Sequence, residues 1–195
     1  MTRLLLATAA VVAISAPAMA DNYNNNSPFA SALTGAYIGA MGGYTYVDAD
    51  VPGGDVNLDG GDYGVFVGYK LDQYLQNTIG VNGAIEAHYA WSGADDDGLE
   101  KDNEWGVSFR PGMSIISNTL NLETVPYAIL GYKRAEIETP AGDNWHDGFE
   151  LGLGTELVAW DHMSTRLEYS HTFYEEKGGI DPDDDSIRLG LGYRF

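Results

Sequence analysis

The chain contains no cysteine and few basic residues. Among its 195 residues, 10 Lys and Arg stand against 29 Asp and Glu, and the formal net charge is −19. Without cysteine, disulfides cannot stabilise the chain if it is exported, and an N-terminal lipid has no thiol to attach to. Without a basic surface, nucleic acid is excluded as a partner, because phosphates are neutralised by Lys and Arg.

Long apolar stretches are absent after the first 20 residues. Arg3, the apolar run 4–14 and the small-residue sequence Ala18-Met19-Ala20 are typical of a secretory signal. The run is too short for a membrane-spanning helix, which needs roughly 20 residues. We therefore expect a Sec-type signal peptide over residues 1–20, cleaved after Ala20. A flexible N-terminal segment over residues 21–34 and one folded domain over residues 35–195 should follow.

What the chain does have is glycine and aromatic residues. It contains 25 Gly and 13 Tyr, and aromatic residues make up 12% of the sequence. A simple soluble domain does not explain this combination well. In a transmembrane β-barrel only every second residue of a strand faces lipid, so the overall hydropathy stays close to that of a soluble protein. The composition therefore favours a membrane barrel.

Alternation of apolar and polar residues recurs in eight segments and is clearest in the last one. There Arg188, Gly190, Gly192 and Arg194 interrupt an apolar series at Ile187, Leu189, Leu191, Tyr193 and Phe195. The two arginines of this second row would not fit the core of a soluble protein, but the lumen of a barrel can be polar. The same phase recurs in the ranges 63–71, 81–91, 105–115, 149–157 and 166–173, whereas 36–47 and 125–138 fit either phase.

Connections between these segments fall into two alternating kinds. Ranges 72–78, 117–121 and 159–164 are short, whereas 48–62, 92–104, 134–147 and 174–186 are longer and carry 21 of the 29 acidic residues. Tryptophans lie where girdles at the membrane surfaces would be, with Trp91, Trp105 and Trp145 near the longer connections and Trp160 beside a short one. The pattern predicts an all-β, eight-stranded antiparallel up-and-down transmembrane β-barrel with short periplasmic turns and long acidic extracellular loops.

Charged residues also occupy the inward positions of the alternating segments. An eight-stranded barrel is just wide enough to be filled by its own side chains, so buried charges there must pair. We expect a polar core plug, with an ion-conducting pathway as the alternative. Five cations and four carboxylates would form this network, namely Lys70, Glu86, Arg110, Glu150, Glu156, Arg166, Glu168, Arg188 and Arg194.

The acidic connections suit a solvated fringe or a cation site. Alternate oxygen donors occur at Asp55, Asn57 and Asp59, and hard cations such as Ca²⁺ prefer oxygen ligands. The closing bidentate Glu of a complete calcium loop is missing, so at most weak Ca²⁺ binding is expected, and no other cofactor. Bridging to cations held by lipopolysaccharide is the other alternative. Asp181, Asp183 and Asp185 form the second set of candidate cation ligands, beside Asp55, Asn57 and Asp59.

Histidines offer little for catalysis. His171 follows Ser170, but consecutive residues of a strand point to opposite faces, which excludes a direct Ser/His dyad. His88 is expected in the lumen near Glu86, His146 in a loop and His162 in a turn. We therefore expect a protein that is not an enzyme.

Three stretches carry a resemblance to a known family. Residues 37–44, 166–169 and 188–195 resemble the small OmpA-like outer-membrane β-barrel superfamily, and within it the single-domain porin-family proteins. The resemblance implies the outer membrane of a Gram-negative bacterium, contact with its lipids and lipopolysaccharide, and a monomer. It also implies that Leu191, Tyr193 and Phe195 are a signal for the barrel-assembly machinery.

The expected function is accordingly a non-catalytic one. A structural role in envelope integrity, or a role in surface interaction, comes first. A narrow porin-like channel and a divalent-cation-binding surface protein are the alternatives, and an enzyme that modifies lipid A ranks below them.

Overall fold

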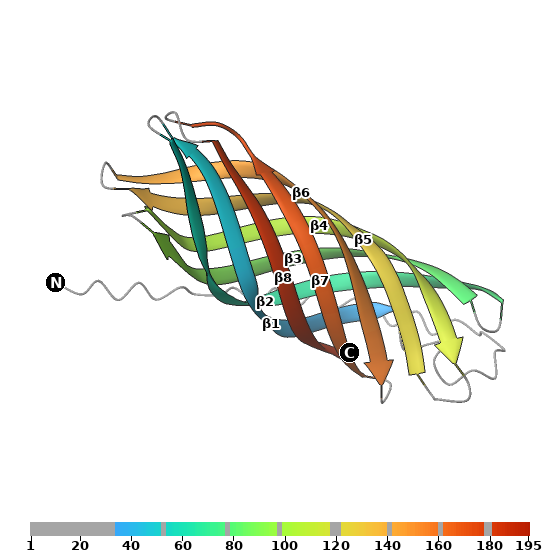
Figure 1. Ribbon diagram of the computed structural model, residues 1–195. Coiled ribbons are helices and arrows are strands. Elements are labelled where there is room, and N and C mark those ends of the chain that lie inside the picture. The colour runs from blue at the N-terminus through green and yellow to red at the C-terminus, as the bar shows by residue number, and fades with distance from the viewer. Residues whose placement is uncertain are drawn as a thin grey trace.

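The computed structural model describes residues 34–51, 54–76, 79–96, 99–117, 122–139, 142–159, 162–177 and 181–195 (Figure 1). The predicted signal peptide and residues 21–33 of the predicted N-terminal segment lie outside this part. No helix in the described ranges is long and apolar enough to cross a membrane. The elements are β1 (Gly35–Val51), β2 (Gly54–Gln76), β3 (Ile79–Asp96), β4 (Leu99–Ser117), β5 (Leu122–Thr139), β6 (Gly142–Ala159), β7 (Met163–Tyr174) and β8 (Asp181–Arg194).

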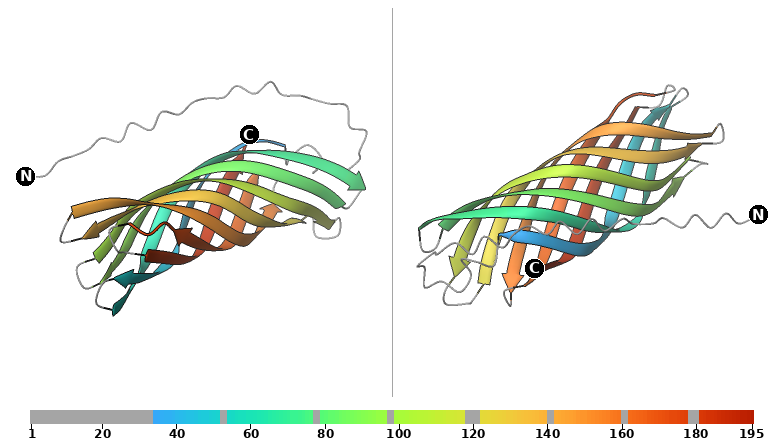
Figure 2. Two further views of the ribbon diagram at one scale, coloured as in Figure 1. Left: turned by 90° about the horizontal axis from the view of Figure 1, so that it is seen from above. Right: turned by 180° about the vertical axis from the view of Figure 1, so that it is seen from behind.

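These eight strands form one closed barrel in chain order. Every neighbouring pair is antiparallel, and β8 closes the sheet by pairing with β1. Near the end of the chain, the Phe195 amide donates a hydrogen bond to the Ala36 carbonyl over 3.0 Å. Figure 2 shows the strands winding steeply around a common axis. The predicted eight-stranded barrel is confirmed. We call the end with Thr34 and Phe195 the terminal rim, and the other end the distal rim.

The outer face of the barrel is apolar, the reverse of a soluble protein. Side chains such as Tyr63, Ile85, Leu153 and Leu191 are 62–68% exposed. Such an apolar band is what a lipid-facing surface requires. In the six segments for which the sequence predicted which residues face outward and which face inward, the structure has the same alternation. It also settles the two ambiguous ones, because Tyr37 and Met41 of β1 and Val125, Tyr127 and Ile129 of β5 are buried inside.

The segments predicted as long loops differ from expectation. β1 and β2 stay paired up to Val51 opposite Gly54, so most of range 48–62 is strand. Ranges 92–104 and 134–147 likewise lie mostly within strands, whereas β7 ends at Tyr174 and β8 begins only at Asp181. Inward side chains explain the extension, because Val47, Leu58 and Ala94 pack together there. The ladder also satisfies backbone groups that a loop would leave to water.

Aromatic residues gather on the outer face of the distal half. Tyr63 stacks on Trp91 at 5.5 Å between ring centroids, and Trp105 lies 5.7 Å from Tyr132. The Arg134 guanidinium lies 5.4 Å from the ring centroid of Trp145. These positions fit the predicted girdle of amphipathic rings at one membrane surface. Trp160, predicted at the opposite surface, lies outside the described residues.

Candidate functional site

Inside the barrel, buried charged side chains form three layers along the axis. Strands four apart in an eight-stranded barrel face each other across the lumen, and each layer contains an ion pair between such strands. In the layer nearest the terminal rim, Lys70 of β2 lies 2.8 Å from Glu156 of β6. Arg194 of β8 contacts the other oxygen of that carboxylate over 3.1 Å. One acid thus holds two cations.

The central layer is a ring of alternating charges between β3, β4 and β7. Glu86 lies 2.8 Å from Arg110 and 2.6 Å from Arg166. Glu168 completes the ring, because it accepts from Arg110 and lies 3.0 Å from the Arg166 Nε. All four side chains are at most 7% exposed. Charges taken out of water are costly unless paired, and here each has two partners of opposite sign.

Aromatic groups support this ring from two sides. The Tyr37 hydroxyl donates to Glu86 over 3.0 Å, and the Tyr127 hydroxyl donates to Glu168 over 2.5 Å. The Phe66 ring lies against Arg166, with 3.5 Å between the ring centroid and the guanidinium carbon. Gly39 leaves the space for that ring, since a Cβ there would lie 2.1 Å from it. The absence of a side chain at Gly39 therefore allows the Phe66 ring to pack in the central layer.

The third layer, nearer the distal rim, is centred on Glu104 of β4. Its carboxylate lies 2.7 Å from Lys101, 2.7 Å from Arg188 and 3.7 Å from Lys133. His88 approaches the same carboxylate at 3.6 Å. Arg188 comes from β8, on the wall opposite β4. Glu104 is 1% exposed, so one buried acid is surrounded by three cations.

Further acids complete this layer. Asp184 of β8 binds Lys101 across the lumen, and its other oxygen accepts from the Ser186 hydroxyl over 3.0 Å. Asp62 of β2 lies 2.6 Å from Arg188, and Glu150 of β6 lies 3.3 Å from Lys133. Among the described residues, seven Lys or Arg and seven Asp or Glu are buried. The interior is therefore close to charge balance.

Four members of the third layer correct the prediction. Asp62, Lys101, Glu104 and Asp184 were predicted in solvated loops, but they are at most 6% exposed inside the barrel. The pairing of strands continues past these positions, so their side chains point into the lumen. Lys133, which was not predicted as a lumen residue, is fully buried there as well.

Little space is left between the first two layers. A cavity of about 20 Å³ lies between Tyr37, Lys70, Arg110 and Glu156. That is room for about one water molecule. The nine residues of the predicted lumen network all lie on the inner face, and every one of them is in an ion pair. Seven belong to the terminal and central layers, and Glu150 and Arg188 belong to the third layer.

The candidate cation ligands whose side chains are described, Asn57, Asp59, Asp183 and Asp185, lie on the outer face near the distal rim. Strand pairing puts Asp48 of β1 opposite both Asn57 and Asp183, so the two predicted sets meet on one face. Asp59 accepts from the Tyr44 hydroxyl, and Asp185 accepts from the Tyr169 hydroxyl over 2.6 Å. Within the described part of the chain, no three His, Cys, Asp or Glu residues are arranged to hold a metal ion. The side chains of Asp55 and Asp181 lie outside it.

The last strand places its predicted assembly residues on the outer face at the terminal rim. Leu191, Tyr193 and Phe195 are 62%, 49% and 74% exposed, and the last two rings meet edge to face at 5.4 Å. Arg194 between them points inward to Glu156. The strand thus joins an apolar outer row to the ion pairs of the lumen.

A closed antiparallel barrel with an apolar outer face and a charged, filled lumen defines the class of transmembrane β-barrels. Residues 6–195 match the family described as outer membrane protein beta-barrel domain. The chain therefore belongs to this family of outer-membrane proteins.

Named relatives agree with that assignment. The 25 kDa outer-membrane immunogenic protein of Brucella ovis is 29% identical, over 98% of this chain and 97% of the relative. The 22 kDa outer membrane protein of Rhizobium leguminosarum bv. viciae is 28% identical, over 85% of this chain and 80% of the relative. The solved structure of Neisserial surface protein A has a TM-score of 0.55 at 12% identity, over 83% of this chain and 98% of that chain, and shows the same fold.

Proposed function

We propose that this protein is a non-conducting, non-catalytic outer-membrane barrel that supports the envelope and presents its distal rim at the cell surface. The layered ion pairs carry this proposal. They join β2 to β6, β3 to β7 and β4 to β8, so three of the four pairs of facing strands are tied together across the lumen. A conducting pathway would have to pass all three layers.

Conductance in planar lipid bilayers tests the closed lumen. The refolded barrel should give no discrete current steps, because the side chains fill its interior. Heat-modifiable migration on an SDS gel verifies that the protein added is folded. Unit steps from the folded protein that change in size in the Glu86→Gln variant would contradict the proposal and support a narrow channel.

The distal rim supports a role in surface interaction. Outward acids there include Asp48, Asp59, Asp183 and Asp185, on the neighbouring strands β1, β2 and β8. Such a surface repels other anions and favours cationic partners, including the divalent cations that accompany lipopolysaccharide. The Brucella ovis relative is named an immunogenic protein, which fits exposure of one rim. Closure of the sheet leaves no unpaired strand edge to which a second copy could add among the described strands, which supports a monomer.

One pair of side chains bears on the alternative that the protein is an enzyme. His171 and Asp185 face outward on β7 and β8, with Nδ1 and the carboxylate 3.0 Å apart, like the two supporting members of a Ser-His-Asp triad. The nucleophile does not fit, because Ser170 is 4% exposed on the inner face and the residue paired with His171 on β6 is Leu151. The arrangement therefore supports a protein without hydrolytic activity.

Mass spectrometry of lipid A tests this conclusion. Expression of the chain in a Gram-negative host should leave the lipid A mass spectrum unchanged, because Ser170 points away from His171 and the residue opposite His171 on β6 is Leu151. The His171→Ala variant at equal outer-membrane level is the matched control. A lipid A product that appears with the wild-type chain and not with this variant would overturn the proposal.

A further inference from the structure

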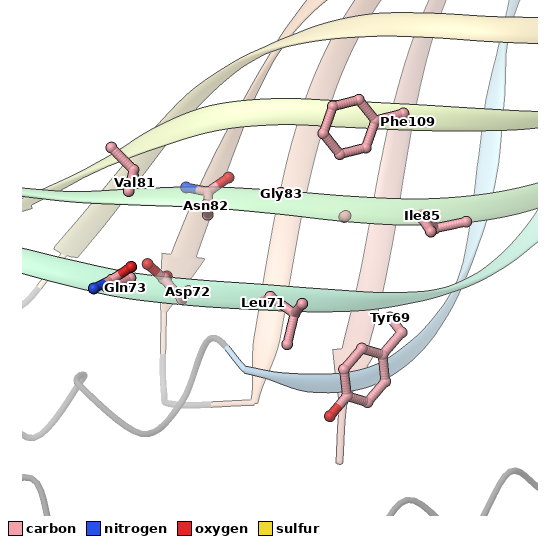
Figure 3. Close-up of a pocket in the computed structure, with 10 residues that line it drawn as sticks. Tyr69, Leu71, Asp72, Gln73, Val81, Asn82, Gly83, Ile85 and Phe109 are labelled. Atoms are coloured by element: carbon pink, nitrogen blue, oxygen red, sulfur yellow. The ribbon is translucent and has the colours of Figure 1, made fainter.

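The outer wall has a hollow near the terminal rim, where β2, β3 and β4 run side by side (Figure 3). Its volume is about 690 Å³, and Tyr69, Leu71, Val81, Ile85 and Phe109 supply its apolar lining. Gly83 lies among them without a side chain, and a Cβ there would lie 3.3 Å from the Phe109 ring. The polar residues Asp72, Gln73 and Asn82 also line it. The hollow therefore suits an apolar segment with polar groups at one side.

The described chain begins at the edge of this hollow. β1 starts at Gly35 opposite Lys70, whereas β2 continues for six residues to Gln76. Thr34 lies against this extension, because its hydroxyl accepts a hydrogen bond from the Asp72 amide over 3.1 Å. Asp72 is itself a lining residue. The chain that precedes Thr34 thus starts next to the apolar lining.

Gly35 changes the direction of the chain at this point. Its φ is +152°, a conformation that residues with a side chain rarely adopt. A Cβ at this position would also lie 3.1 Å from the Phe195 carbonyl oxygen. The backbone therefore bends at the start of β1, and the preceding residues need not continue the line of that strand within the sheet.

The sequence before the bend divides into two parts. Residues 21–27 are Asp-Asn-Tyr-Asn-Asn-Asn-Ser, whereas residues 29–33 are Phe-Ala-Ser-Ala-Leu. Five extended residues reach about 17 Å. The apolar part is directly adjacent to Thr34, and the polar part is farther away and suited to water.

We propose that residues 29–33 pack into this hollow as a strap across β2 and β3, with Phe29 and Leu33 as its apolar anchors. The strap covers apolar wall that lipid would otherwise contact, and residues 21–27 then extend into water at the terminal rim. The proposal is independent of whether the lumen conducts.

Cysteine cross-linking tests this placement, because the chain contains no cysteine of its own. The mature protein, reconstituted in phospholipid nanodiscs, would carry Leu33→Cys together with Gly83→Cys or Gln73→Cys and react with a short bismaleimide. Leu33→Cys with Leu153→Cys is the control, because Leu153 is 68% exposed on β6, outside the hollow. We expect at least ten-fold faster intramolecular cross-linking for either hollow pair than for the control.

A second variant distinguishes packing in the hollow from mere proximity. Gly83→Trp should fill the hollow and reduce the rate for the Leu33→Cys and Gln73→Cys pair to the control level, while the barrel stays heat-modifiable. Equal rates for hollow and control pairs would overturn the proposal and leave the hollow to a lipid acyl chain. A rate that Gly83→Trp does not change in a folded barrel would overturn it as well.

Discussion

Replacing Glu86 with alanine is expected to lower the free energy of unfolding by about 3–5 kcal/mol. The side chain is fully buried and pairs with Arg110 at 2.8 Å and with Arg166 at 2.6 Å. Its loss leaves two cations in the lumen with only Glu168 between them. It also removes the acceptor of the Tyr37 hydroxyl. Urea unfolding of the barrel refolded into lipid vesicles, followed by tryptophan fluorescence, measures the change.

Two further variants make this prediction specific. Glu86→Gln keeps the volume and an acceptor for Tyr37 but removes the charge, so its cost should lie between those of wild type and alanine. Glu175→Ala removes an exposed carboxylate at the distal rim and should change stability by no more than about 0.5 kcal/mol. If Glu86→Ala costs no more than Glu175→Ala, the central ring is not a source of stability.

Much of the barrel could be predicted because a single physical rule governs every strand. Lipid accepts only apolar side chains, so residues such as Leu189 and Leu191 mark the outer face, and Arg188 between them must point inward. Strands β1 and β5 lacked this contrast. Gly42 and Gly43 present no side chain that favours either face, and in β5 the inward residues Val125 and Ile129 are as apolar as an outer face would be.

Asp62, Lys101, Glu104 and Asp184 of the third layer were missed because they were assigned to loops by composition. The alternation itself continues, since Asp62 is in phase with Phe66 and Lys70, and Asp184 is in phase with Arg188. Following that phase beyond the apolar band would have placed both acids in the lumen. Lys101 could not have been placed in this way, because the register between β4 and β5 shifts between Lys101 and Glu104, so that both point inward.

Which charged residues pair across the lumen could not be predicted from the sequence, for a different reason. Glu86 and Arg166 are 80 positions apart, and Lys101 and Asp184 are 83 apart. Which charges meet depends on the stagger of all eight strands, and no local pattern records that stagger. The sequence therefore predicts that inward charges must pair, and the closed sheet decides which pairs form.

Replacing Glu104 with alanine is expected to have a similarly large effect, about 3–5 kcal/mol, because it leaves Lys101, Lys133 and Arg188 close together with less negative charge between them. The same urea unfolding measurement applies. Since Arg188 belongs to β8 and Glu104 to β4, the loss should also loosen the two walls near the distal rim. Hydrogen exchange in β8 should then increase more than in β6.

A double variant separates the charge imbalance from loss of packing. Adding Lys101→Met to Glu104→Ala removes one of the unbalanced cations, while Asp184 keeps its hydrogen bond from Ser186 at 3.0 Å. Residues in one ion-pair network couple by 0.5–3 kcal/mol, so the double variant should be less destabilised than the sum of the two single variants by roughly that amount. Strict additivity would show that Glu104 acts by filling space and not by balancing charge. A positive coupling would establish the third layer as an electrostatic unit that holds opposite walls of the barrel together.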